Sequence, residues 1–189
     1  SLFMCHMASS VLLNGRNVLY ITMEMAEEKI AERIDANLLN VPIQDLVDLP
    51  KTSFENKVIN LNKKTQGQLI IKEYPTASAH SGHFKALLNE LALKKSFKPD
   101  IIFVDYLNIC ASSRYKGSAN INSYTLVKSI AEELRGLAVE AEVPIVSATQ
   151  TTRSGYGSSD VDLTDTSESF GLPATADLMF ALISTEELE

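Results

Sequence analysis

Cysteine and histidine are scarce in this 189-residue sequence. Its two cysteines, Cys5 and Cys110, each lie alone inside an apolar run. Two isolated thiols can form neither a disulfide framework nor a tetrahedral zinc site, so we expect both to be buried core residues of a reducing compartment. The three histidines, His6, His80 and His83, are too scattered along the chain to indicate a metal site.

Basic residues are also fewer than acidic ones. The chain has 17 Lys and Arg against 24 Asp and Glu, which gives a formal net charge of −7. No global basic field therefore indicates nucleic-acid binding. Any contact with DNA must come from a local patch or from residues outside this sequence.

Long apolar runs are absent as well. The apolar opening, residues 1–13, is shorter than the roughly 20 residues that cross a bilayer. It has neither a basic leader nor an initiating methionine, so we expect a chain that begins within a domain and not a signal sequence. These absences predict a cytoplasmic protein without a membrane partner.

The sequence does contain a regular alternation of strand and helix patterns. Hydrophobic residues make up 45% of the chain, enough for one continuous core. Helical patterns separate short apolar runs, which we interpret as strands, at 17–22, 69–73, 101–104, 144–148 and 178–183. The helical patterns cover residues 1–13, 26–39, 53–64, 82–95 and 123–142. Strands that are apolar along their whole length and separated by helices predict an α/β fold in one domain. Its sheet would be mostly parallel, with helices on both faces.

Three polar residues follow these strands: Glu24, Asp105 and Gln150. Because the carboxyl ends of parallel strands meet at one edge of a sheet, we expect the three side chains to lie together. Each has a simpler interpretation by itself. Asp105 could cap the next helix, Glu24 could interact with the dipole of the helix that follows, and Gln150 could be an ordinary polar residue.

Taken together, the three residues match the requirements of phosphoryl transfer to water. A carboxylate after a buried strand, such as Asp105, can hold a hydrated Mg²⁺ that bridges phosphates. Glu24 lies between two methionines, where a poorly hydrated carboxylate could act as general base. The amide of Gln150 could sense a γ-phosphate. A phosphate loop of the form G-x-x-x-x-G-K-S/T is missing from the sequence.

The ordered motifs resemble those of DnaB-type replicative DNA helicases, especially the branch found in T4-like bacteriophages. The strings NVLYITMEM and IIFVDY resemble the segment that carries the family's catalytic glutamate and its Walker B strand. AEELRGLA, followed by a strand ending in Q-x-x-R, is similar to the family's helix and sensor strand. DTSES and a later Ala-Asp resemble its last motif. The four motifs keep the family's order over essentially the whole chain.

This resemblance implies a RecA-like P-loop NTPase core that uses ATP and Mg²⁺. Ser1 matches the last residue of the family's phosphate loop. The resemblance therefore assigns Mg²⁺ and nucleotide binding to Ser1 and Asp105, the attack of water to Glu24, and γ-phosphate sensing to Gln150.

The resemblance also implies an assembly and partners. It indicates a ring hexamer that hydrolyses ATP between subunits, moves along single-stranded DNA and works with a primase and a helicase loader. Residues 1–189 would then be a core truncated at both ends and inactive alone, because the arginine finger of the family lies beyond Glu189.

Two loops that leave the same sheet edge, residues 112–122 and 151–160, are candidates for DNA contact. They carry Arg114, Lys116 and Arg153 beside tyrosines, which suits phosphate contact and base stacking, although both could be plain solvated loops. A RecA/RadA-like or KaiC-like ATPase, or a catalytically silent interaction module on the same fold, are the alternatives. A dinucleotide enzyme would need a glycine fingerprint that this sequence lacks.

Overall fold

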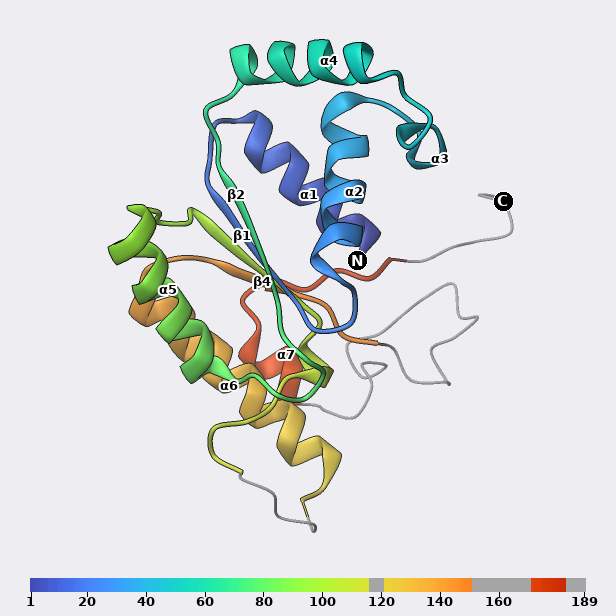
Figure 1. The fold of residues 1–189 in the computed structure, drawn as a ribbon. Helices are drawn as coiled ribbons and strands as arrows, with labels where there is room; N and C mark the ends of the chain where they lie inside the picture. The colour runs from blue at the N-terminus through green and yellow to red at the C-terminus, as the bar shows by residue number, and fades with distance from the viewer. Residues whose placement is uncertain (116–120, 151–170, 183–189) are drawn as a thin grey trace, which may run out of the picture.

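The computed structural model describes residues 1–115, 121–150 and 171–182, which build a parallel sheet between two layers of helices (Figure 1). The strands are β1 (Val18–Thr22), β2 (Leu69–Glu73), β3 (Ile101–Asp105) and β4 (Ile145–Ser147), in the order β2-β1-β3-β4. Every neighbouring pair is parallel. The predicted α/β class and parallel sheet are confirmed.

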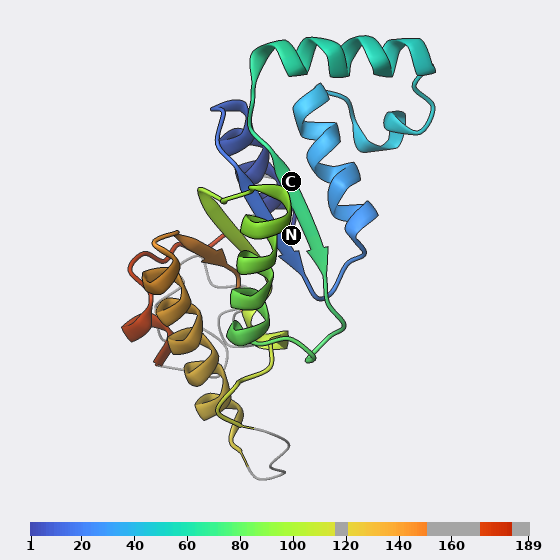
Figure 2. The same cartoon turned by 60° about the vertical axis from the view of Figure 1, so that its left-hand side comes forward.

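Side chains of the central strands alternate between two apolar cores. Helices α1 (Leu2–Leu13) and α2 (Glu27–Leu39) pack on one face of the sheet, against Tyr20 and Phe103. Helices α5 (Ser81–Lys95) and α6 (Ser123–Ala141) pack on the other, against residues such as Ile21 and Val104 (Figures 1 and 2). Because both faces are covered, β1 is buried along its whole length, as its unbroken apolar run predicts.

The remaining elements are short or peripheral: α3 (Ile43–Leu46), α4 (Lys51–Lys64), the 3₁₀ turn η1 (Leu107–Ile109) and α7 (Gly171–Thr175). Helix α4 crosses the top of the molecule in Figure 1 and has no buried residue. The predicted helix boundaries lie within about two residues of those observed. Gly15, predicted to end α1 in the left-handed region, has φ 75°.

Both cysteines are buried, as predicted: Cys5 lies within α1 and Cys110 directly follows η1. Among the residues that the structure describes, no helix has the length and apolar character that a membrane crossing requires.

The prediction of a strand at residues 178–183 is wrong for residues 178–182, the part that the structure describes. Residues 178–182 carry no strand pairing, and Ile183 lies outside the described residues. Leu178 is 79% exposed, and Phe180 makes an edge contact with Phe3 of α1 instead of entering a core. An apolar run forms a strand only where a neighbour takes up its backbone hydrogen bonds, and none of the described strands does so here.

Candidate functional site

Glu24 and Asp105 leave the sheet side by side. β1 and β3 are neighbours in parallel register, with Thr22 opposite Asp105. The backbone N–H of Met23 donates to the carbonyl of Asp105 at 3.1 Å. Glu24 therefore lies one residue beyond this hydrogen bond between the ends of β1 and β3. The Thr22 hydroxyl donates to the Met25 carbonyl at 2.8 Å and accepts from the Met25 N–H at 3.1 Å. This turn positions Glu24 at the carboxyl edge of the sheet.

Asp105 is 2% exposed, and a hydrogen bond from a neighbouring strand holds its carboxylate. The Tyr20 hydroxyl donates to Asp105 Oδ2 at 2.8 Å. Burial raises the pKa of Tyr20, and the charge of Asp105 raises it further, so the phenol keeps its proton and remains a donor. The predicted metal-holding carboxylate is therefore buried on the face of the sheet that α1 covers.

Tyr106 lies beside Gln150 and within electrostatic range of Glu24. The Gln150 amide Nε2 lies 3.5 Å from the Tyr106 hydroxyl, at the outer limit of a hydrogen bond. Burial raises the pKa of Tyr106, as do the negative charges of Glu24 and Asp105, which are both in electrostatic range of this one hydroxyl. The three predicted strand-end residues thus share one neighbourhood. Tyr106 belongs to the IIFVDY motif, which by itself predicts no role for this residue.

The end of β4 is tied to the chain that follows β3. The Leu107 N–H donates to the Ala148 carbonyl at 3.1 Å, and the Thr149 hydroxyl donates to Asn108 Oδ1 at 2.8 Å. These contacts fix the backbone just before Gln150. The predicted sensor residue therefore sits on a segment whose position depends on the chain directly after Asp105.

One part of the sequence-based interpretation of Glu24 is wrong. Glu24 was expected to be poorly hydrated between its two methionines, but the structure leaves it exposed. Met23 turns into the core on the α5 and α6 side of the sheet, and Met25 packs at the border of the other core. The methionines therefore anchor the turn instead of shielding the carboxylate.

Ser1 stands at the start of α1, on the same face of the sheet as Asp105. Its carbonyl accepts the Cys5 N–H at 2.9 Å, and its side chain caps no helix N–H. Burial raises the pKa of the Cys5 thiol. Smaller effects come from Tyr20, Arg33 and Asp105, so Asp105 lies in electrostatic range of this thiol on α1.

The oxygen atoms of this edge suit Mg²⁺. No group of three or more His, Cys, Asp or Glu that could hold a metal occurs in the described ranges. Mg²⁺, however, is usually bound through one or two protein oxygens together with substrate phosphates and waters. The Ser1 hydroxyl and the Asp105 carboxylate are hard oxygen donors of this kind, so the residues present fit the ion.

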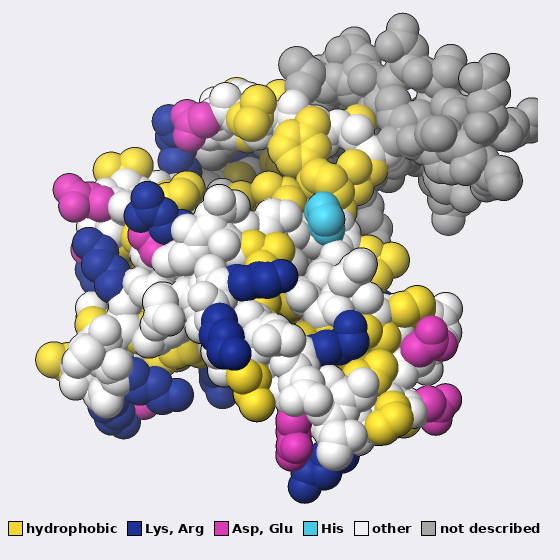
Figure 3. Space-filling model, turned by 90° about the horizontal axis from the view of Figure 1, so that it is seen from above, with side chains coloured by type: hydrophobic (Ala, Val, Ile, Leu, Met, Phe, Trp, Pro, Cys, Tyr) yellow, Lys and Arg dark blue, Asp and Glu magenta, His cyan; other side chains and the backbone are white. Residues whose placement is uncertain are grey.

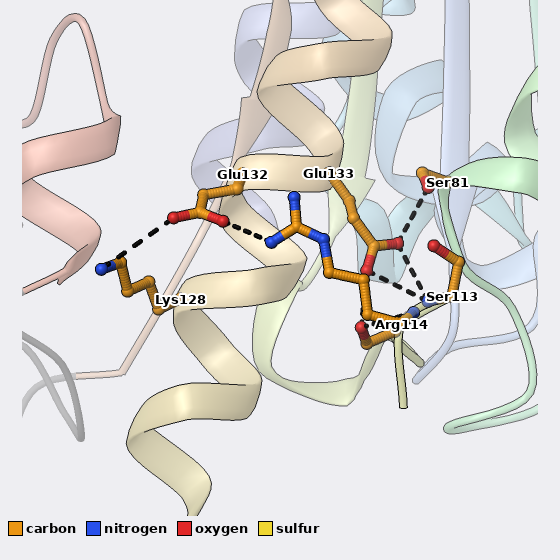
Figure 4. Close-up of polar contacts among 7 residues, drawn as sticks. Ser81, Ser113, Arg114, Lys128, Glu132 and Glu133 are labelled. Atoms are coloured by element: carbon orange, nitrogen blue, oxygen red, sulfur yellow. Dashed lines mark hydrogen bonds and ion pairs between the residues drawn. The ribbon is translucent and has the colours of Figure 1, made fainter. Parts of the chain in front are cut away.

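Arg114, the one predicted DNA contact that the structure describes, packs against α6. Arg114 forms an ion pair with Glu132 on α6, and neighbouring Glu133 accepts from Ser81 and from the Ser113 N–H (Figure 4). Arg114 is therefore held against α6 and not beside Glu24. Lys116 and Arg153 lie outside the described residues.

Two hollows among the described residues lie away from this edge. A hollow of about 330 Å³ lies at the opposite end of the strands, by Asn17 and Asp100, and one of about 400 Å³ lies between α5 and α6, by Ser81 and Glu140. On the face that Figure 3 shows, Lys and Arg side chains are separated by hydrophobic and polar ones. The case for the carboxyl edge therefore depends on its chemical groups.

The chain belongs to the family of DnaB-like helicases, since the family described as "DnaB-like helicase C terminal domain" matches residues 1–188. It is 52% identical over 191 residues to a DnaB-like replicative helicase of Enterobacteria phage T4, covering 100% of this chain and 40% of that protein. It is 28% identical over 184 residues to the replicative DNA helicase DnaB of Helicobacter pylori strain 26695, covering 95% of this chain and 36% of that protein. The chain thus spans about two fifths of the length of such relatives.

Solved structures share the fold. A DnaB-like replicative helicase, determined with its interactions with primase, superposes with a TM-score of 0.72 at 19% identity, over 94% of this chain and 42% of that one. A second solved structure, an ATPase domain, gives a TM-score of 0.70 at 18% identity, over 94% of this chain and 64% of that one. The predicted family, its likeness to T4-type phage helicases and the RecA-like fold are confirmed.

Proposed function

We propose that the complete protein containing this chain is a replicative DNA helicase, which couples ATP hydrolysis to movement along single-stranded DNA and to unwinding. The observation that carries the proposal is the pairing of Glu24 and Asp105 at the ends of adjacent buried strands, in a chain of the DnaB-like family. A base and a metal-holding carboxylate on one sheet edge are what phosphoryl transfer to water requires.

In this proposal the metal and nucleotide are held on the α1 side of the edge. Asp105, through water, and the Ser1 hydroxyl would hold Mg²⁺, which when bound neutralises charge on the phosphates. The burial of Asp105 and the hydrogen bond from Tyr20 keep its carboxylate in one orientation. The sequence has no phosphate loop, and in this proposal residues other than 1–189 would supply the loop amides and the lysine.

Glu24 would orient the attacking water and accept its proton. Its exposure in the single chain suits a site that a neighbouring subunit closes, as expected for a ring hexamer hydrolysing ATP between subunits. Gln150 would report the γ-phosphate, with the Tyr106 hydroxyl as its neighbour. Residues 1–189 alone would not turn over ATP, because positioning and charge stabilisation by the missing groups supply most of the rate.

The proposed DNA contacts and protein partners are inferred from the family relationship. Lys116 and Arg153 would contact the DNA backbone, while Arg114 would have to exchange Glu132 for a phosphate in order to do so. A primase and a helicase loader would be the protein partners.

The test uses the complete natural protein and the substitution Glu24→Gln. We expect ATP hydrolysis stimulated by single-stranded DNA in the wild type and a loss of about 10²-fold or more in kcat in the variant. Binding of a fluorescent ADP analogue should be retained. Glu28→Gln removes an exposed carboxylate from α2, one turn later, and should leave kcat unchanged.

Other results would change the proposed function. Hydrolysis that survives Glu24→Gln would remove Glu24 from the chemistry. Filaments on DNA in place of closed rings, seen by electron microscopy, would favour a RecA/RadA-like recombinase. A wild type that neither binds nor hydrolyses nucleotide would favour a silent interaction module.

A further inference from the structure

Tyr20 places a hydroxyl group inside a core made mainly of apolar side chains. The residue is fully buried, and its ring stacks on Phe103 of the neighbouring strand with centroids 5.7 Å apart and planes 19° apart. The core around it contains Val18, Ile30 and Ile34. Phenylalanine would fill this position with the same ring and no polar atom to desolvate. A buried hydroxyl is costly unless it is hydrogen-bonded, so the identity of its partners matters.

The Tyr20 hydroxyl has two polar partners among the described residues. The Tyr20 O–H donates to Asp105 Oδ2 at 2.8 Å, and the Cys5 Sγ–H donates weakly to the Tyr20 oxygen at 3.8 Å. A hydroxyl whose oxygen accepts a hydrogen bond from one side directs its own O–H to the other. The thiol on α1 therefore helps to point the phenol at the carboxylate, and a chain of two hydrogen bonds crosses the core from α1 to β3.

The second oxygen of Asp105 takes no hydrogen bond from the residues that the structure describes. Oδ2 is occupied by Tyr20, and the stacked ring cannot swing away because Phe103 and helices α1 and α2 enclose it. The carboxylate is thus fixed at one oxygen and keeps acceptor capacity at the other.

We propose that Tyr20 is a positioning residue for the metal-holding carboxylate. By bonding Oδ2 it sets the plane of the Asp105 carboxylate and leaves Oδ1 for the water shell of Mg²⁺. This inference rests on the proposed function. Hydrogen-bond partners that orient a metal-holding group typically change metal affinity or activity about 10- to 100-fold when they are removed.

The experiment compares Tyr20→Phe with wild type in the complete protein. Binding of N-methylanthraniloyl-ADP is followed by fluorescence while Mg²⁺ is titrated, and the Mg²⁺ half-saturation is then measured again from ATP hydrolysis. We expect the half-saturation of Tyr20→Phe to rise about tenfold in both assays. At saturating Mg²⁺, kcat should recover most of its wild-type value. A purely structural defect would lower kcat and the midpoint of thermal unfolding without moving the Mg²⁺ curve.

Tyr74→Phe is the matched control. Tyr74 is partly buried against Phe84 and makes no hydrogen bond through its hydroxyl to the described residues, so its Mg²⁺ half-saturation should equal that of wild type. Cys5→Ala is the second variant, for the case that Tyr20→Phe does not fold. It leaves the bond to Asp105 but removes the donor that directs the phenol, and we expect a smaller increase, about twofold to threefold.

The outcomes separate this inference from the proposed function. Mg²⁺-dependent nucleotide binding in wild type with an unchanged Mg²⁺ curve in folded Tyr20→Phe overturns the role of Tyr20 alone. An unchanged curve in Cys5→Ala overturns it where Tyr20→Phe is unfolded. Wild type that binds the nucleotide without any dependence on Mg²⁺ overturns both proposals.

Discussion

Removal of the Glu133 carboxylate should weaken the attachment of the loop that begins at Ser112. Glu133 on α6 accepts from the Ser112 hydroxyl at 2.5 Å, from the Ser81 hydroxyl at 2.9 Å and from the Ser113 N–H at 3.0 and 3.1 Å. It thereby joins the start of α5 and the chain after β3 to the middle of α6 (Figure 4). Glu133→Ala removes all of these contacts in one step.

The magnitude follows from the exposure of the three donors. A hydrogen bond to a charged group contributes about 1.5–3 kcal/mol where its partner is buried, and Ser112 is 5% exposed. Ser81 is half-buried and Ser113 is exposed, so water can replace their bonds at a cost of about 0.5 kcal/mol each. We therefore expect Glu133→Ala to lower the free energy of unfolding by about 3 kcal/mol. Glu133→Gln, which keeps one acceptor, should lower it by about 1 kcal/mol.

The assay is urea unfolding of residues 1–189 followed by circular dichroism at several pH values. Burial alone would raise the pKa of Glu133, but hydrogen bonds from Ser112, Ser113 and Ser81 outweigh it and the pKa is lowered. A lowered pKa means that the stabilisation is present above the unfolded value, about 4.3, and is lost as the pH falls through the folded pKa. The difference between wild type and Glu133→Ala should therefore be constant from pH 7 to 5 and shrink below about pH 4.

Asp48→Asn is the control for this series. Asp48 is exposed between α3 and α4 and has no ion pair or hydrogen bond with the described residues, so its loss should change the free energy of unfolding by less than about 0.5 kcal/mol. A Glu133→Ala variant as stable as Asp48→Asn at pH 7, or a deficit that does not change with pH, would refute the reasoning.

Two further predictions concern close packing and thiol burial. Gly67→Ala should destabilise the chain by about 2 kcal/mol in the same urea assay, because the new Cβ would lie 2.7 Å from the Arg16 carbonyl oxygen and 2.8 Å from that of Leu12. Burial raises the pKa of Cys110 to about 12, the charge of Glu133 adding to it, and burial also raises the pKa of Cys5. Neither thiol should react with Ellman's reagent in the native chain at pH 8, and both should react in guanidinium chloride; rapid labelling of the native chain would contradict their burial.

The sheet could be predicted from the sequence because its strands satisfy a local rule. Continuous apolar runs at β1 and β3 are typical of strands covered on both faces, and the polar residue after each run marks the carboxyl edge. The expectation that Glu24 and Asp105 lie at one edge followed from this rule together with the geometry of a parallel sheet. The segment 178–182 obeys the same local rule but has no strand partner in the described residues, so the rule failed there.

Contacts that join distant segments were outside the reach of local patterns. Tyr20 fits a strand as a β-forming residue, and only the parallel register of β1 and β3 brings its hydroxyl to Asp105. Arg114 looks like a free basic side chain in a polar loop, yet α6 supplies Glu132 as its partner. The hydration of Glu24 depends on what covers the sheet edge, which its two neighbouring methionines do not determine.

The most direct test of the central claim is a structure of the complete protein with Mg²⁺ and a non-hydrolysable ATP analogue. We predict that the metal lies at the carboxyl edge near Ser1 and Asp105, with Glu24 facing the terminal phosphate. Nucleotide bound elsewhere, for example in the hollow by Asn17 and Asp100 at the opposite edge, would contradict it.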